Sequence, residues 1–163
     1  MGKSILDGKK LLAVDDEPDI LDVLEEEILG GCSQCVIDKA TTYEQAVKYL
    51  EKPDYDIVIL DIMGVRGFEL LEMAVKKKLK VVMLTAHALN PEALQRSYEM
   101  KARAYLPKDK LGEINSYLED VLTQDFESGW KGLYKKLRDF FDDIFGDDWE
   151  KKAGIKAKGW GEY

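Results

Sequence analysis

The chain has 163 residues, of which 45% are hydrophobic and 34% charged, a composition typical of a folded globular protein. With 32 acidic against 24 basic residues, the formal net charge is -8, and such a surface repels nucleic-acid backbones. No apolar run approaches the roughly 20 residues that span a membrane, and the N-terminus lacks the pattern of a signal peptide. We therefore expect a cytoplasmic protein without a membrane span and without nucleic-acid binding.

Short apolar runs alternate with segments of helical periodicity along residues 10–125. Strands are predicted at residues 10–14, 35–37, 57–60, 81–84 and 104–106. Helices are predicted at residues 18–29, 42–50, 67–77 and 110–125, and another is predicted to start at Pro91. Pro18 and the pair Asn90–Pro91 are typical of helix starts, and Thr41 with Glu44 resembles a capping box. Strict alternation predicts an α/β fold with a doubly wound, five-stranded parallel sheet covered by helices on both faces.

The alternation ends at residues 127–129, and a different pattern follows. Eight apolar side chains then fall on one face of a helix: Trp130, Leu133, Tyr134, Leu137, Phe140, Phe141, Ile144 and Phe145. This width is typical of a buried face, so we predict a C-terminal amphipathic helix. Residues 8–126 are assigned to one domain, and residues 127–163 to a helical extension with a flexible tail.

Three roles for the C-terminal helix stay open. The first role is packing on its own domain, the second is docking to a partner protein, and the third is pairing with its counterpart in a homodimer. Binding to a membrane surface is disfavoured, because Asp139, Asp142 and Asp143 oppose an anionic bilayer.

Cys32 and Cys35 form a Cys-x-x-Cys pair directly before an apolar strand. A redox pair is typical of a helix start, where the helix dipole lowers the pKa of a thiol. A zinc site needs two further ligands, and His87 is the only histidine. We interpret the pair as two ordinary, partly buried thiols, with a functional pair as the alternative.

Polar side chains follow the strands at the edge where a doubly wound sheet binds its ligands. They are Asp15, Asp16 and Glu17 after the first strand, Asp61 after the third, Thr85 after the fourth and Lys108 after the fifth. Single Asp or Thr residues at strand ends commonly cap the next helix, but the whole set at the correct ends favours a site.

Carboxylates brought this close repel one another unless a cation neutralises them, and hard oxygen ligands suit Mg²⁺. Such an ion shields charge while the Asp61 carboxylate attacks phosphorus. Thr85 can donate a hydrogen bond to one phosphoryl oxygen, and Lys108 can neutralise another. The set therefore indicates phosphoryl transfer.

Four segments in order are similar to the response-regulator receiver family, over about residues 10–125. They are Leu-Leu-Ala-Val-Asp15-Asp16-Glu-Pro-Asp, Ile-Val-Ile-Leu-Asp61-Ile-Met, Val-Met-Leu-Thr85-Ala and Ala-Tyr105-Leu-Pro-Lys108. The resemblance implies the flavodoxin-like strand order 2-1-3-4-5. It also implies that Asp61 accepts a phosphoryl group from the phosphohistidine of a sensor histidine kinase or phosphotransfer protein.

The same resemblance assigns further roles around Asp61. Asp16, Asp61 and the backbone carbonyl of Met63 would bind Mg²⁺ directly, and Asp15 would act through water. Tyr105 matches a switch aromatic that moves inward when Thr85 shifts toward the phosphoryl group.

The chain departs from the family pattern at two places. Gly67 stands only six positions after Asp61 and the usual Pro is absent, so the loop is about two residues short beside the metal. Asp109 follows Lys108 where the family has Pro, which excludes the usual cis Lys–Pro bond. His87 lies where the family controls access of water to the phosphoryl group; an exposed loop histidine without a role is the alternative.

The function expected is a stand-alone receiver that signals to a downstream protein through its fourth helix, fifth strand and fifth helix. It would be no enzyme beyond its own phosphorylation and dephosphorylation. A phosphorylation-independent interaction module is the alternative. A hydrolase of small phosphoesters is a third hypothesis, disfavoured because no lid or cap domain is visible.

Overall fold

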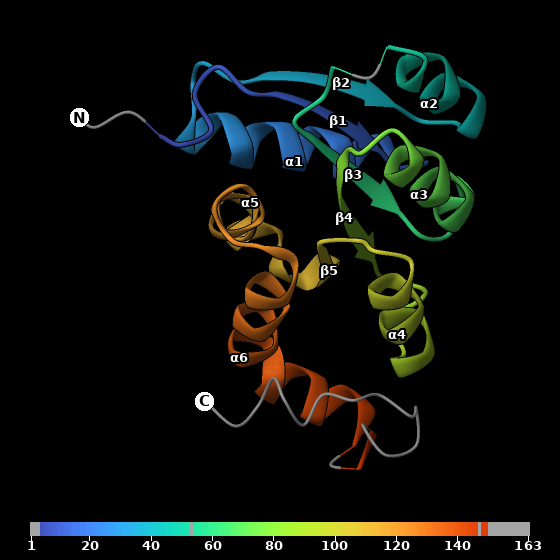
Figure 1. Ribbon diagram of the computed structural model, residues 1–163, viewed down its shortest axis with the longest axis vertical. Helices are drawn as coiled ribbons and strands as arrows, with labels where there is room; N and C mark the ends of the chain where they lie inside the picture. The colour runs from blue at the N-terminus through green and yellow to red at the C-terminus, as the bar shows by residue number, and fades with distance from the viewer. Residues whose placement is uncertain (1–3, 53, 147, 150–163) are drawn as a thin grey trace.

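A five-stranded parallel sheet with the order β2-β1-β3-β4-β5 forms the centre of the protein (Figure 1). The computed structural model describes residues 4–52, 54–146, 148 and 149. The strands are β1 (Lys10–Val14), β2 (Val36–Ala40), β3 (Ile57–Asp61), β4 (Lys80–Thr85) and β5 (Ala104–Pro107). The predicted fold class and strand order are confirmed, and each predicted strand is present with ends shifted by at most a few residues.

Helices cover both faces of the sheet. They are α1 (Pro18–Gly31), α2 (Tyr43–Leu50), α3 (Gly67–Lys76), α4 (Pro91–Glu99), α5 (Ile114–Thr123) and α6 (Phe126–Phe145), with a 3₁₀ helix at Lys108–Glu113. Figure 1 shows α1 and α5 on one face and α2, α3 and α4 on the other. The central strand β3 is buried along its whole length, as its unbroken apolar sequence predicts.

Two predicted helix starts are explained by side-chain caps. Asn90 accepts a hydrogen bond from the backbone N–H of Ala93 at 2.7 Å, as expected from Asn before Pro91. The capping box of α2 lies one residue later than predicted. Thr42 is the cap and accepts from the Gln45 N–H at 3.1 Å, while the Gln45 side chain accepts from the Thr41 N–H at 2.8 Å. Gln45 replaces the expected Glu44 because it stands three residues after the true cap.

The C-terminal helix begins at Phe126, so the predicted break at residues 127–129 is wrong. Asp125 caps α6 by accepting a hydrogen bond from the Ser128 N–H at 2.8 Å, which gives the helix its start before Gly129. Five side chains of the predicted apolar face are buried: Trp130, Leu133, Tyr134, Leu137 and Phe141. Ile144 lies outside this buried set and is 53% exposed. Since α6 packs on α5 and β5, the helix is buried against its own chain.

Three further expectations concern the cysteines, the tail and membranes. Cys32 and Cys35 are joined by a disulfide, so their interpretation as ordinary thiols is wrong; the turn between α1 and β2 brings the two sulfurs together. The predicted flexible tail falls mostly outside the described residues, but Trp149 is 1% exposed and donates from Nε1 to Asp142 at 2.9 Å. No helix of the described residues is long and apolar enough to cross a membrane.

Candidate functional site

The carboxyl ends of β1, β3, β4 and β5 bring four predicted site residues together. Asp61 and Thr85 are the last residues of β3 and β4, and Asp15 and Lys108 directly follow β1 and β5. Pairing in register aligns these ends, with Val14 opposite Leu60 and Asp61 opposite Leu84. Asp15, Asp61 and Thr85 are 0%, 3% and 0% exposed, so the site is built from buried polar groups.

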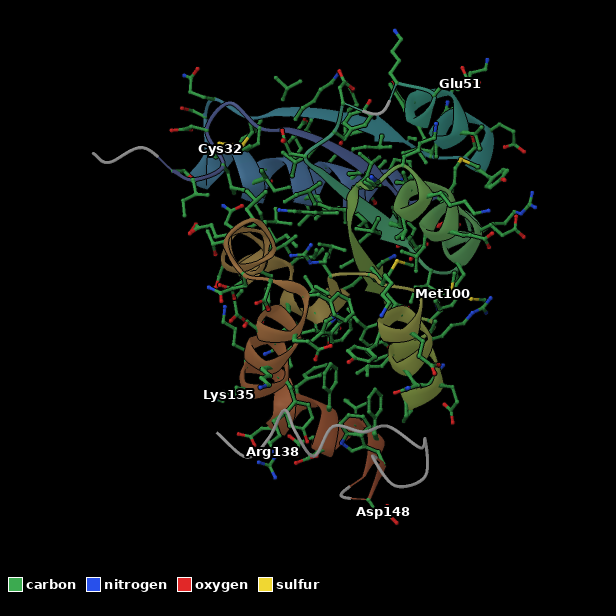
Figure 2. All side chains as sticks on the ribbon, viewed as in Figure 1. Cys32, Glu51, Met100, Lys135, Arg138 and Asp148 are labelled. Atoms are coloured by element: carbon green, nitrogen blue, oxygen red, sulfur yellow. A yellow bond between two sulfur atoms is a disulfide. The ribbon has the colours of Figure 1, made fainter. Side chains whose placement is uncertain are left out.

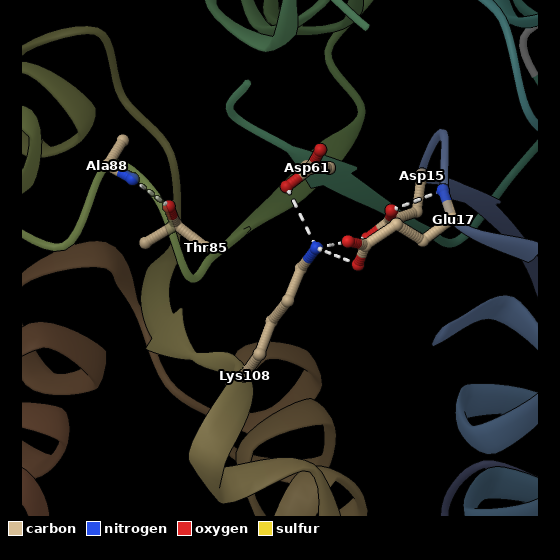
Figure 3. A network of polar contacts seen from close by, with 6 residues as sticks. All are labelled: Asp15, Glu17, Asp61, Thr85, Ala88 and Lys108. Carbon is tan, nitrogen blue, oxygen red and sulfur yellow. Dashed lines mark hydrogen bonds and ion pairs between the residues drawn. The ribbon is translucent and has the colours of Figure 1, made fainter. Parts of the chain in front are cut away.

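Lys108 holds the acidic side chains together (Figure 3). Its Nζ lies 2.9 Å from Asp15 Oδ2, 3.2 Å from Glu17 Oε2 and 3.3 Å from Asp61 Oδ1. The Lys108 side chain is only 7% exposed. Burial lowers the pKa of Lys108, but its contacts with Asp15 and Asp61 outweigh this and raise the pKa above its usual value. The ammonium group therefore stays charged and offsets part of the negative charge around it.

Asp15, Asp16 and Asp61 form an acidic cluster suited to a divalent cation. One carboxylate oxygen from each lies within 4.8 Å of the others. Burial, and then the charge of Asp15, raise the pKa of Asp61 to about 7, against the opposing effect of Lys108. Burial also raises the pKa of Asp15. One ammonium group thus leaves negative charge uncompensated, and oxygen donors at this spacing fit Mg²⁺.

Two glycines allow the short loop after Asp61 to lie close to the acidic cluster. Gly64 has φ +86, and a Cβ atom there would be 2.5 Å from the Asp16 carboxylate. Gly67 donates its N–H to the Ile62 carbonyl at 3.0 Å, and a Cβ at Gly67 would collide with the Asp61 carbonyl. The shortened loop is therefore closed by packing of Gly67 on the backbone of Asp61 and Ile62 and of Gly64 on the Asp16 carboxylate, where glycine leaves the room that a Cβ atom would fill.

A second hydrogen-bonded group connects Thr85 to Tyr105 through the β4–α4 loop. Thr85 Oγ1 accepts from the Ala88 N–H at 2.7 Å. The hydroxyl of Tyr105 donates to the Ala88 carbonyl at 2.7 Å and accepts from the Asn90 N–H at 3.1 Å. The Tyr105 side chain is 0% exposed, so it lies in the inward position.

The structure brings together the polar side chains that the sequence singles out, whereas the backbone features around them are not predicted. Glu17 was expected at this edge and contacts Lys108, while the Met63 side chain is 52% exposed on the loop. His87 is exposed on the β4–α4 loop. The close approach of Gly64 and Gly67 was missed, although the short spacing between Asp61 and Gly67 was a signal for it.

The arrangement defines a class of proteins: doubly wound α/β domains with an acidic, lysine-bridged site at the carboxyl edge of the sheet. The model of the response regulator receiver domain matches residues 11–119. The chain therefore belongs to the response regulator receiver domain family, whose members are signalling domains rather than classical enzymes.

Individual relatives agree with this assignment. The two-component response regulator ARR18 of Arabidopsis thaliana is 37% identical over 128 residues, which cover 74% of this chain and 19% of that protein. The chain thus spans about one fifth of the length of this relative.

Solved structures are similar as well. The response regulator protein TrrA from Thermotoga maritima, in complex with Mg²⁺ and BeF, is 34% identical, with a TM-score of 0.59 over 70% of this chain and 99% of that one. A CheY-like receiver domain protein from Methanospirillum hungatei is 24% identical, with a TM-score of 0.55 over 83% of this chain and 94% of that one, and shows the fold alone.

Proposed function

We propose that the chain is a phospho-accepting receiver in which Asp61 takes a phosphoryl group from a phosphohistidine. The observation that carries this proposal is the buried Asp61 carboxylate 3.3 Å from Lys108, in one cluster with Asp15 and Asp16. A nucleophile in phosphoryl transfer needs a fixed position and compensation of charge, and both are present at Asp61.

In the proposed step, an oxygen of Asp61 bonds to phosphorus while the N–P bond of the donor phosphohistidine breaks. The imidazole leaves with the electron pair of that bond. Lys108 neutralises charge on the phosphoryl oxygens, and the hydroxyl of Thr85 donates a hydrogen bond to one of them. The phosphoryl donor would be a cognate sensor histidine kinase or phosphotransfer protein, and the reaction would take place in the cytoplasm.

We assign Mg²⁺ to the acidic cluster. Asp16, Asp61 and the Met63 carbonyl would hold the ion directly and Asp15 through water; the similar Thermotoga structure was solved with Mg²⁺ and BeF. When bound, the ion would neutralise the cluster and bind phosphoryl oxygens. Gly64 supports this assignment, because it lets the loop that carries Met63 approach the Asp16 carboxylate.

Incubation with Mg²⁺ and acetyl phosphate, followed by intact mass measurement, tests this function. We expect one acid-stable, base-labile phosphate adduct on the wild type and none on Asp61→Asn. Omission of Mg²⁺ should abolish the adduct on the wild type. Exposed Asp109→Asn is the matched control and should leave it unchanged.

The alternative function is an interaction module that keeps the fold without accepting phosphate. The short loop between Asp61 and Gly67 favours it, because the Gly67 backbone packs directly on the Asp61 carbonyl. Absence of any adduct on the folded wild type would support this alternative. An undiminished adduct on Asp61→Asn would refute Asp61 as the acceptor and show that another residue takes the phosphate.

A further inference from the structure

The helix α6 covers the face formed by α4, β5 and α5, which the sequence predicted as the surface that signals to a downstream protein. Figure 1 shows α6 below α5, on the side of β5, the edge strand of the sheet, with α4 across from it. Trp130 donates from Nε1 to the Ala102 carbonyl at 2.9 Å, just before β5. Lys136 contacts Asp120 of α5 at 2.6 Å, and Glu127 accepts from the hydroxyl of Tyr98 of α4 at 3.0 Å. All three elements of this face therefore hold α6.

The ring of Tyr105 packs against α6, and the hydroxyl of Tyr105 is hydrogen-bonded to the β4–α4 loop. The centroids of the Tyr105 and Phe141 rings are 6.1 Å apart, and Phe141 is 1% exposed. The hydroxyl of Tyr105 bonds to Ala88 and Asn90 in the loop, as described above. With α6 in place, the space outside β5 is filled, and outward rotation of the Tyr105 ring would collide with the helix.

The same loop fixes the hydroxyl of Thr85. The Ala88 N–H occupies an acceptor position of Thr85 Oγ1 at 2.7 Å, which leaves the hydroxyl proton able to point elsewhere. Thr85 ends β4, and β4 is the neighbour of β3, which ends in Asp61. A phosphoryl group on Asp61 can therefore accept a hydrogen bond from the Thr85 hydroxyl. A contact path thus runs from Phe141 through Tyr105 and Ala88 to Thr85.

We propose that docking of α6 on the α4–β5–α5 face and phosphorylation of Asp61 stabilise each other through Tyr105. The docked helix holds Tyr105 inward and keeps Thr85 arranged to bind the phosphoryl group. Because coupling between two sites is reciprocal, a phosphoryl group bound by Thr85 tightens α6 on the face. The inference rests on the proposed function of Asp61.

This coupling concerns which side of α6 faces solvent in the phosphorylated protein. In the phosphorylated protein the α4–β5–α5 face is closed by α6, and the outer side of α6 is presented instead. Lys135 and Arg138 point away from the protein on this side (Figure 2).

Two measurements on the full chain test the coupling. Hydrogen exchange of α6 is followed with and without Mg²⁺ and beryllofluoride, a mimic of the phosphoryl group. We expect slower exchange of the α6 amides in the loaded wild type, and no change in Asp61→Asn. Separately, the half-life of the acetyl-phosphate adduct is measured in three variants: Phe141→Ala, Tyr105→Phe and Ile144→Ala.

Phe141→Ala removes the ring that contacts Tyr105, and Tyr105→Phe keeps that ring contact but removes the bonds to Ala88 and Asn90. We expect both variants to lose the adduct at least about fivefold faster than wild type, the lower end of usual coupling factors. The matched control is Ile144→Ala on the same helix, where the side chain is 53% exposed, and it should keep the wild-type half-life.

The outcomes separate the two proposals. No adduct on the wild type would refute phospho-acceptance itself. An adduct with faster or unchanged exchange of α6 on loading would refute the coupling alone. If Phe141→Ala does not fold, Tyr105→Phe decides, because it keeps the aromatic packing; a wild-type half-life in that variant would overturn the inference.

Discussion

Two regions that both involve β5 or the residue that follows it are built on opposite physical principles. The strand-end site holds three acidic side chains around Lys108, and burial raises the pKa of its central carboxyl group. The seam between α6 and the domain is aromatic, with Trp130 and Phe141 each 1% exposed. Like charges in a buried site weaken the fold, whereas apolar burial strengthens it. The difference indicates that apolar packing in the seam offsets the loss of folding stability caused by the like charges of the site.

The largest effect is expected in the seam. Trp130→Ala removes a buried indole and its hydrogen bond to Ala102, and should lower the free energy of unfolding by about 3–5 kcal/mol in urea denaturation. Ile144→Ala, on the exposed side of α6, should change it by less than about 0.5 kcal/mol. Similar losses in both variants would show that α6 contributes little through this seam.

The strand-end site should respond in the opposite direction. Asp61→Asn in the presence of a chelator should raise the free energy of unfolding by about 2–3 kcal/mol at pH 8, because the buried charge disappears. This is less than the roughly 4 kcal/mol that a change of about three pKa units represents, a change that already includes the opposing effect of Lys108.

The direction in which the free energy of unfolding changes with pH follows from the raised pKa of Asp61, about 7 in the folded protein. The stabilisation from its protonated form is complete below the unfolded-state pKa of about 4 and is lost as the pH rises through about 7. The advantage of Asp61→Asn should therefore shrink between pH 8 and pH 5. An advantage that does not vary with pH would contradict a buried, charge-crowded Asp61.

The site and the seam also differ in how well the sequence predicted them. Asp15, Asp61, Thr85 and Lys108 meet as expected, because strand ends of a parallel sheet converge on one edge once the strands are located. The apolar stripe predicted that α6 buries a face, but a stripe does not specify the surface that receives it. Packing against Tyr105 is a long-range choice that helical periodicity does not encode.

A third variant tests how tightly the site depends on its short loop. Gly67→Ala places a methyl group against the Asp61 carbonyl and should cost about 2 kcal/mol of stability, with slower formation of the phosphate adduct. Gly112→Ala is the matched control, since a Cβ there would have no atom within 4 Å. An equal response of the two variants would show that the loop yields without disturbing Asp61.

The smallest effect is expected at the disulfide, which belongs to neither region. Cys32 and Cys35 are separated by three positions, so the bond closes a short loop and restricts the unfolded chain only modestly. Cys32→Ala with Cys35→Ala should lower the free energy of unfolding by about 1–2 kcal/mol, as should a reductant on the wild type.

The pair also lies before β2, at the opposite end of the strands from Asp61, so the half-life of the phosphate adduct should not change. Such a result would sharpen the contrast between the regions, because a loss of stability alone would then leave the chemistry intact. An altered half-life in the double variant would instead mean that global stability governs the adduct. Effects of Phe141→Ala would then need to exceed those of the double cysteine variant at matched stability to support coupling through Tyr105.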